Sequence, residues 1–154
     1  MRVLFVCLGN ICRSPAAEGI FQHFVNEQAL SSSISCDSAG IIGFHSGNRA
    51  DSRMITHAHD RGYAVTSISR QFDPNTDFDD FDLIIGMDRD NIEALHGMTR
   101  TEEDAKKIQL MTRYTTKSSH DVVPDPYYGG SDGFDLVLDL LEDACSGLLE
   151  SIQK

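Results

Sequence analysis

The feature that most constrains the fold is the alternation of short apolar runs with helical patterns along the whole chain. The apolar run Val3–Val6 predicts a buried strand, and further strands are expected at Ile34–Ala39, Phe81–Met87 and Lys107–Met111. Strands that alternate with helices form βαβ units around a parallel sheet, so the chain is expected to be one α/β domain over residues 1–154. Ligands of such sheets bind beyond the carboxyl ends of the strands, which points to the first strand–helix turn.

Four helices are expected to accompany these strands. Pro15 is expected to open the first one, because proline is favoured at the first helical position. Polar helices are expected over Asp51–Arg61, ending at Gly62, and over Asp88–His96. The last helix is expected to begin near Asp132. Its apolar stripe consists of Phe134, Val137, Leu138, Leu141, Cys145, Leu148 and Ile152.

The turn after the first strand is suited to hold a tetrahedral oxyanion. In a strand–turn–helix segment, successive backbone N–H groups can point inward at an anion, and the helix dipole reinforces them. Gly9 and Asn10 tolerate the positive φ angles that a tight cradle often needs. Arg13 adds a planar fork that matches two phosphate oxygens. The expected phosphate-binding loop comprises Leu8, Gly9, Asn10, Ile11, Cys12 and Ser14, closed by Arg13.

Cys7 lies where the strand enters this cradle. A helix N-terminus and a neighbouring arginine favour the thiolate, which is the nucleophilic form of cysteine. The arrangement predicts attack of the Cys7 sulfur on phosphorus, while the loop N–H groups and Arg13 stabilise the equatorial oxygens. Ser14 is placed to hydrogen-bond the thiolate. The competing interpretation is a small apolar residue buried at a strand end, since Cys-x5-Arg alone is a weak motif.

Asp125 is the candidate general acid for the departing oxygen. It lies between Pro124 and Pro126, which stiffen the loop and hold the carboxyl outward. Tyr127 and Tyr128 follow directly and are suited to wall a slot for an aromatic group. The competing interpretation is an ordinary turn, in which aspartate and proline are common.

Charge and cysteine usage limit the classes of partner and compartment. The chain has 13 Lys and Arg against 24 Asp and Glu, a net charge of -11, which argues against a nucleic-acid partner. No apolar run approaches the roughly 18 residues of a membrane span, and the N-terminal run is too short for a signal peptide. The four cysteines show no disulfide framework, which favours the reducing cytoplasm. No metal is expected, because no ligand set is completed around Cys7 and Cys12.

The segments VCLGNICRSPAAEG and DPYYG resemble the low-molecular-weight protein tyrosine phosphatases. DSAG, SRQF and GMDRDN extend the resemblance over nearly the whole chain. It implies a four-stranded parallel twisted sheet with helices on both faces and no cofactor. It also implies that Cys7 is the nucleophile, Arg13 the phosphate ligand and Asp125 the general acid and base. The implied substrates are phosphotyrosine proteins or small aryl phosphates, and inorganic phosphate is the implied product and inhibitor.

The resemblance assigns further roles around this centre. Asn10 is implied to hold the loop through side-chain hydrogen bonds, and Phe44 joins Tyr127 and Tyr128 in walling the substrate cleft. Cys12 is implied to pair with Cys7 on oxidation, which would protect the nucleophile. Ser67 stands where many members carry a histidine.

Three alternatives remain open from the sequence. Arsenate reductases of this fold need further relay cysteines, whereas Cys36 and Cys145 are expected in the core. Protein-arginine phosphatases tend to carry threonine where Ile11 stands, and an apolar side chain there favours phosphotyrosine. A non-catalytic phosphate-binding module would be expected to lack Cys7 or Asp125. One further departure from the family's pattern is Ser69, which replaces an alanine.

Overall fold

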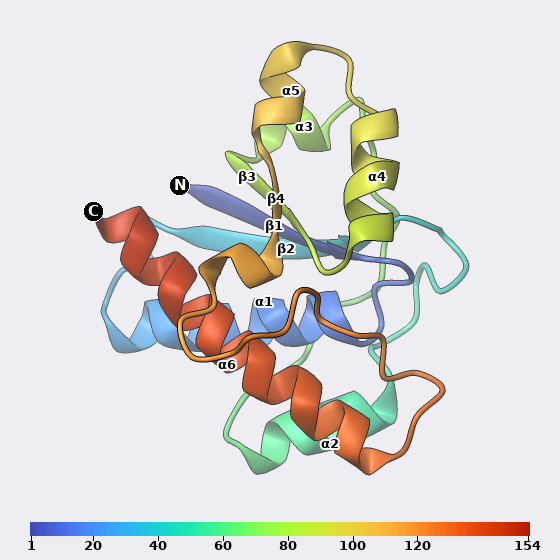
Figure 1. The fold of residues 1–154 in the computed structure, drawn as a ribbon, viewed down its shortest axis with the longest axis vertical. Coiled ribbons are helices and arrows are strands. Elements are labelled where there is room, and N and C mark those ends of the chain that lie inside the picture. Colours follow the sequence, from blue (N-terminus) through green and yellow to red (C-terminus); the bar gives the residue numbers. More distant parts are fainter.

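A four-stranded parallel sheet forms the centre of the computed structural model, which describes all residues, 1–154 (Figure 1). Its strands are β1 (Arg2–Cys7), β2 (Ser35–Gly40), β3 (Leu83–Gly86) and β4 (Ile108–Leu110). The helices are α1 (Arg13–Glu27), α2 (Ser52–Asp60), α3 (Asp77–Asp80), α4 (Arg89–Gly97), α5 (Glu102–Lys106) and α6 (Ser131–Gln153), and a 3-10 helix spans Met111–Tyr114. None of the helices combines the length and apolarity that a membrane span requires.

The two faces of β1 belong to two different hydrophobic cores, because successive side chains of a strand point to opposite faces. Val3, Phe5 and Cys7 contribute to the larger core, which also contains the apolar faces of α1, α2 and α6. Leu4 and Val6 contribute to the smaller core on the other face, on the side of α3, α4 and α5 (Figure 1). The expected sheet with helices on both faces is therefore confirmed.

The strand order β2-β1-β3-β4 sets the site beside the end of β1. The chain leaves β1 on one side to form β2 and returns on the other side to form β3, so the direction of winding reverses between β1 and β3. Val6 pairs with Gly86 in this parallel register. The segments that follow β1 and β3 therefore emerge side by side at one edge of the sheet.

The strands were predicted in the right places, with ends that differ by one or two residues. The predicted strand Phe81–Met87 is reduced to Leu83–Gly86, because Phe81 instead caps the short helix α3. The helices α3 and α5 were not predicted, since four or five residues are too few to show a helical period. Asp51 and Asp88 accept hydrogen bonds from the first-turn N–H groups of α2 and α4, which gives these helices the expected starts.

The first helix begins two residues earlier than expected. It starts at Arg13, so Pro15 is its third residue rather than its first. Proline is tolerated there because the N–H groups of the first turn have no partner inside the helix. Cys12, the residue before the helix, makes no side-chain cap. The N–H of Ser14 instead faces the Cys7 sulfur, at 3.4 Å, so this helix end faces the functional site.

Candidate active site

The thiol of Cys7 lies at the end of β1 beneath the loop that leads into α1. Cys7 is buried, with 2% of its surface exposed. Its Sγ lies 3.0 Å from Ser14 Oγ and accepts the Ser14 backbone N–H at 3.4 Å. The structure thus brings Cys7 and Ser14 together as expected, and the backbone N–H of Ser14 at the helix N-terminus is directed at the sulfur.

Asn10 holds the middle of the loop from the inside. It is buried and adopts a positive φ of 58°, a conformation for which asparagine is one of the favoured residues. Its Nδ2 donates to Ser14 Oγ at 2.7 Å, and its Oδ1 accepts the backbone N–H of Arg70 at 3.0 Å. Asn10 therefore links the hydroxyl that contacts Cys7 to a segment of chain sixty residues away.

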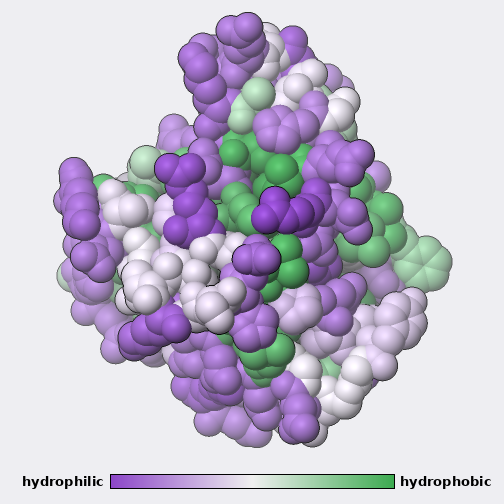
Figure 2. Space-filling model, in the orientation of Figure 1, coloured by the Kyte–Doolittle hydropathy of each residue, from purple (hydrophilic) through white to green (hydrophobic).

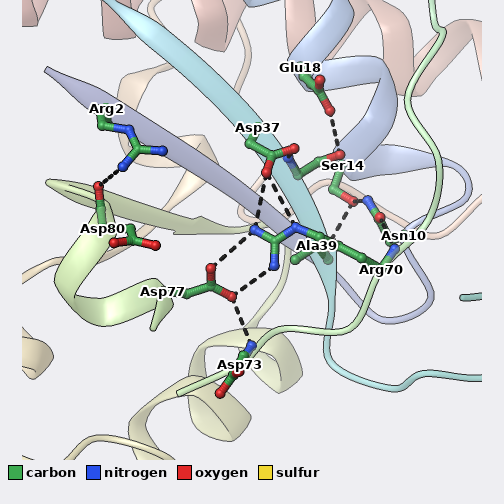
Figure 3. A network of polar contacts seen from close by, with 11 residues as sticks. Arg2, Asn10, Ser14, Glu18, Asp37, Ala39, Arg70, Asp73, Asp77 and Asp80 are labelled. Atoms are coloured by element: carbon green, nitrogen blue, oxygen red, sulfur yellow. Dashed lines mark hydrogen bonds and ion pairs between the residues drawn. The ribbon is translucent and has the colours of Figure 1, made fainter. Parts of the chain in front are cut away.

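Arg70 is fixed behind the loop by two carboxylates, a network that the sequence did not reveal (Figure 3). Its guanidinium contacts Asp37 Oδ2 at 3.2 Å and Asp77 Oδ2 at 3.0 Å. The carbonyl of Arg70 accepts the N–H of Gly40, whose missing side chain lets the end of β2 approach the loop. A Cβ at Gly40 would lie 3.0 Å from the backbone of Gly9, so a larger residue would push the loop out of place.

Ser67, at the position where the resemblance suggests a histidine, lies beside the carboxyl group of Glu18. A cavity of about 70 Å³ has both residues in its lining. Glu18 accepts a hydrogen bond from Ser38 Oγ at 2.6 Å. Burial raises the pKa of Glu18, and nearby Asp37 adds to the effect, while the Ser38 and Ser67 hydroxyls and Arg70 act in the opposite direction.

A glutamine at position 18 is expected to stabilise the fold at neutral pH. Since the pKa of Glu18 is raised in the folded state, folding stability falls as pH rises through the unfolded and then the folded pKa. Glu18→Gln removes this loss, and its amide oxygen can still accept from Ser38. We expect a higher midpoint of thermal unfolding than native at about pH 7.5, with the difference vanishing near about pH 4. Exposed Glu93→Gln is the control; a Glu18→Gln variant less stable than native at the higher pH would contradict the account.

Arg13 spans the space between the loop and the segments after β3. It is 2% exposed, and its Nη1 donates to Asp88 Oδ2 at 2.6 Å and to the Val123 carbonyl at 3.1 Å. Burial opposes its charge, but the neighbouring Cys7, Asp88 and Asp125 side chains outweigh burial and raise the pKa of Arg13. Arg13 therefore stays charged, and its orientation is set by Asp88, a residue to which the sequence analysis assigned no role.

Asp125 reaches the same place from the other end of the chain. Its Oδ2 lies 3.6 Å from Arg13 Nη2, and its Oδ1 accepts the backbone N–H of Tyr127 at 3.0 Å. The side chain is 40% exposed, so it faces the mouth of the site. Arg53 Nη2 donates to the Tyr127 carbonyl at 3.0 Å and so ties this loop to α2.

A pocket of about 220 Å³ brings Cys7, Arg13 and Asp125 together. Its lining residues are Cys7, Leu8, Gly9, Ile11, Cys12, Arg13, Ile42, Phe44, His45, Asp125, Tyr127 and Tyr128. At its rim, Phe44 is 81% exposed and Tyr128 is 94% exposed, whereas Cys7 lies at the bottom. Apolar atoms project at the right-hand edge of Figure 2, where Figure 1 has the loop that follows β2. Ile42 and His45 also line the pocket, and neither was singled out as a site residue.

Cys12 lines the pocket as a neutral thiol. Burial raises its pKa, and the negative charges of Asp51, Cys7 and Asp125 raise it further, with Arg53 acting in the opposite direction. It is 3% exposed. The two loop cysteines therefore differ: Cys7 accepts the backbone N–H of Ser14 at the helix N-terminus, and its sulfur also contacts the Ser14 hydroxyl.

Comparison with known proteins assigns this arrangement to a family. The family model of the low molecular weight phosphotyrosine protein phosphatases matches residues 2–154. A protein of Synechocystis sp. that carries a low molecular weight protein-tyrosine-phosphatase name is 47% identical over 100% of this chain and 98% of its own.

Solved structures agree with this assignment. The crystal structure of a protein tyrosine phosphatase from Entamoeba histolytica, with Hepes in the active site, superposes with a TM-score of 0.96 at 46% identity, covering 99% of this chain and 97% of its own. The crystal structure of DARP, drosophila arginine phosphatase, superposes with a TM-score of 0.92 at 32% identity, covering 100% and 99%. The chain belongs to the low-molecular-weight phosphotyrosine protein phosphatase family and is a protein-tyrosine phosphatase, a phosphoric monoester hydrolase.

Proposed function

We propose that this phosphatase works in two steps through a phosphorylated Cys7. In the first step the Cys7 sulfur bonds to phosphorus, the bond from phosphorus to the phenolic oxygen breaks, and Asp125 gives its proton to that oxygen. In the second step Asp125 takes a proton from water, which attacks phosphorus. The sulfur–phosphorus bond then breaks, which releases inorganic phosphate and restores the thiolate.

The observation that carries this proposal is the convergence of three groups on one pocket. The nucleophile Cys7 is at the bottom, Arg13 is beside it, and Asp125 lies 3.6 Å from the arginine at the mouth. During transfer the phosphoryl group carries its charge on three equatorial oxygens, which the loop N–H groups and Arg13 are suited to hold. Ser14, 3.0 Å from the sulfur, is suited to stabilise the departing thiolate in the second step.

The pocket walls support a phosphotyrosine residue or an aryl phosphate as the substrate. Eight of the twelve lining residues are hydrophobic, and Ile11 offers no hydroxyl that would bind the nitrogen of a phosphoarginine. Phe44 and Tyr128 stand at the rim, where they would contact the face and edge of an aromatic ring. We also propose a cytoplasmic location, because the mechanism requires Cys7 to be kept reduced.

The sharpest test of the acid role is a comparison of leaving groups. Asp125→Ala is expected to lower kcat/KM for a phosphotyrosine peptide by about 10²- to 10⁴-fold. The loss for p-nitrophenyl phosphate should be smaller, because nitrophenolate is a better leaving group and needs protonation less. The tyrosine phenolate needs it more, since its conjugate acid has a pKa of about 10. The assay is run with a chelator present, so that any activity measured does not depend on free metal ions.

Asp121→Ala is the matched control for this experiment. Asp121 is an exposed aspartate in the same loop, and only its backbone carbonyl is engaged, by Thr112. The control should keep the native rate with both substrates. Equal losses for both leaving groups in Asp125→Ala would remove the acid role. A native protein that binds phosphate but hydrolyses neither substrate would favour a binding module or phosphoarginine as the substrate.

A further inference from the structure

Ser69 is a buried hydroxyl in direct contact with the phosphate-binding loop. It is 5% exposed, and its Oγ donates to the carbonyl oxygen of Asn10 at 2.5 Å. Its own backbone is held on both sides: its N–H donates to the Asn48 carbonyl at 2.8 Å, and its carbonyl accepts the Gly47 N–H at 2.9 Å. The position of the Ser69 backbone is thus fixed by contacts outside the phosphate-binding loop.

Ser69 and Arg70 donate hydrogen bonds to the backbone and the side chain of Asn10. The backbone N–H of Arg70 donates to Asn10 Oδ1 at 3.0 Å, while Ser69 donates to the Asn10 carbonyl. Asn10 is the loop residue with the positive φ of 58°, a conformation that costs energy in any residue other than glycine. Two hydrogen bonds from consecutive residues therefore stabilise the loop residue that has the positive φ.

The contact with the Asn10 carbonyl has a consequence for the pocket. A trans peptide unit is planar, so the carbonyl of Asn10 and the N–H of Ile11 point in opposite directions. Ser69 holds the carbonyl on the side away from the site, and Ile11 lines the pocket. Fixing the carbonyl therefore fixes the direction of the Ile11 N–H, one of the donors available to phosphate oxygens.

We propose that Ser69 is a positioning residue, which aims the Ile11 N–H at the phosphoryl group through its hydrogen bond to the Asn10 carbonyl. The inference rests on the proposed function of the loop. Ser69 touches neither the substrate nor the thiol, so it acts only through the loop.

The test compares Ser69→Ala with Ser69→Thr, which restores a hydroxyl. Ser69→Ala is expected to lower kcat with p-nitrophenyl phosphate about tenfold, because a loop donor then loses its alignment with the transition state. KM should change by less than about threefold, while the dissociation constant of inorganic phosphate rises by about threefold. Ser69→Thr should recover most of the native kcat. Ser151→Ala is the matched control, since Ser151 Oγ donates to the Leu148 carbonyl at 2.8 Å in α6.

The outcomes separate positioning from mere stabilisation. Native kcat and phosphate affinity in Ser69→Ala, with only a lower midpoint of unfolding, would overturn the proposal. So would a Ser69→Thr variant with a native unfolding midpoint and the low kcat of Ser69→Ala. If the native chain shows no turnover, the proposed function fails, and titration with inorganic phosphate in a calorimeter still decides the role of Ser69.

Discussion

Cys7→Ser is expected to lose hydrolysis completely, with kcat at least about 10⁵-fold below native. A serine hydroxyl ionises far less readily than a thiol, and the groups that contact this side chain at the end of β1 are the hydroxyl and the N–H of Ser14, neither of which is a base. Because the phosphate-binding loop and Arg13 are unchanged, the variant should still bind inorganic phosphate. The measurements are steady-state hydrolysis of p-nitrophenyl phosphate and phosphate affinity by calorimetry.

The covalent intermediate is the second readout of the same experiment. Native protein quenched in acid during turnover should carry one phosphoryl group on the peptide that contains Cys7, and Cys7→Ser should carry none. Cys36→Ser is the control, because Cys36 is a half-buried cysteine on β2 whose thiol contacts Glu18 and Gln22. A phosphoryl group found on another residue, or native turnover in Cys7→Ser, would exclude the mechanism.

Arg13→Lys is expected to have a large effect as well, a fall in kcat/KM of about 10³-fold. Lysine keeps the charge but cannot offer two parallel N–H donors to two phosphate oxygens. It also cannot serve Asp88 and the Val123 carbonyl as the guanidinium does, at 2.6 and 3.1 Å. The loss should appear in kcat as well as in KM, since the fork holds the equatorial oxygens most tightly in the transition state.

Arg89→Lys provides the comparison for this change. Arg89 is exposed and begins α4 directly after Asp88, so it tests whether an arginine-to-lysine change in this region matters by itself. We expect native kinetics from the control. An Arg13→Lys variant that kept more than about a third of the native kcat/KM would mean that charge alone, without the planar fork, supports the reaction.

The sheet and the reactive groups were predictable because their signals are local. The first and third strands are short apolar runs, and Cys7 and Arg13 lie within seven residues of one another at the end of the first run. Strand ends were less predictable, since an apolar residue beside a strand, such as Phe81, can be buried by contacts outside the sheet. Phe81 follows α3 instead of extending β3, and the Cζ atom of Arg2 lies 4.7 Å from the centroid of the Phe81 ring.

The supporting residues were not predictable because their roles depend on contacts between distant segments. Asp37 and Asp77 resemble ordinary surface carboxylates in the sequence until the pairing of the Arg70 segment with the end of β2 brings Arg70 between them. Asp88 caps α4 and orients Arg13 at the same time, a double role that the side-by-side pairing of β1 and β3 creates. The same holds for Ser69, whose partner lies 59 residues earlier.

The hydrogen bond from Arg13 to the Val123 carbonyl has a consequence for how such an enzyme can diversify. The contact uses a backbone oxygen, so it does not depend on the side chain at position 123. The loop that carries Asp125 is thereby anchored to Arg13 at a point two residues before Asp125. Tyr127 and Tyr128, beyond that anchor, can be exchanged over evolutionary time without displacing the proton donor. New substrates can therefore be acquired at the rim while the reaction at the bottom is inherited unchanged.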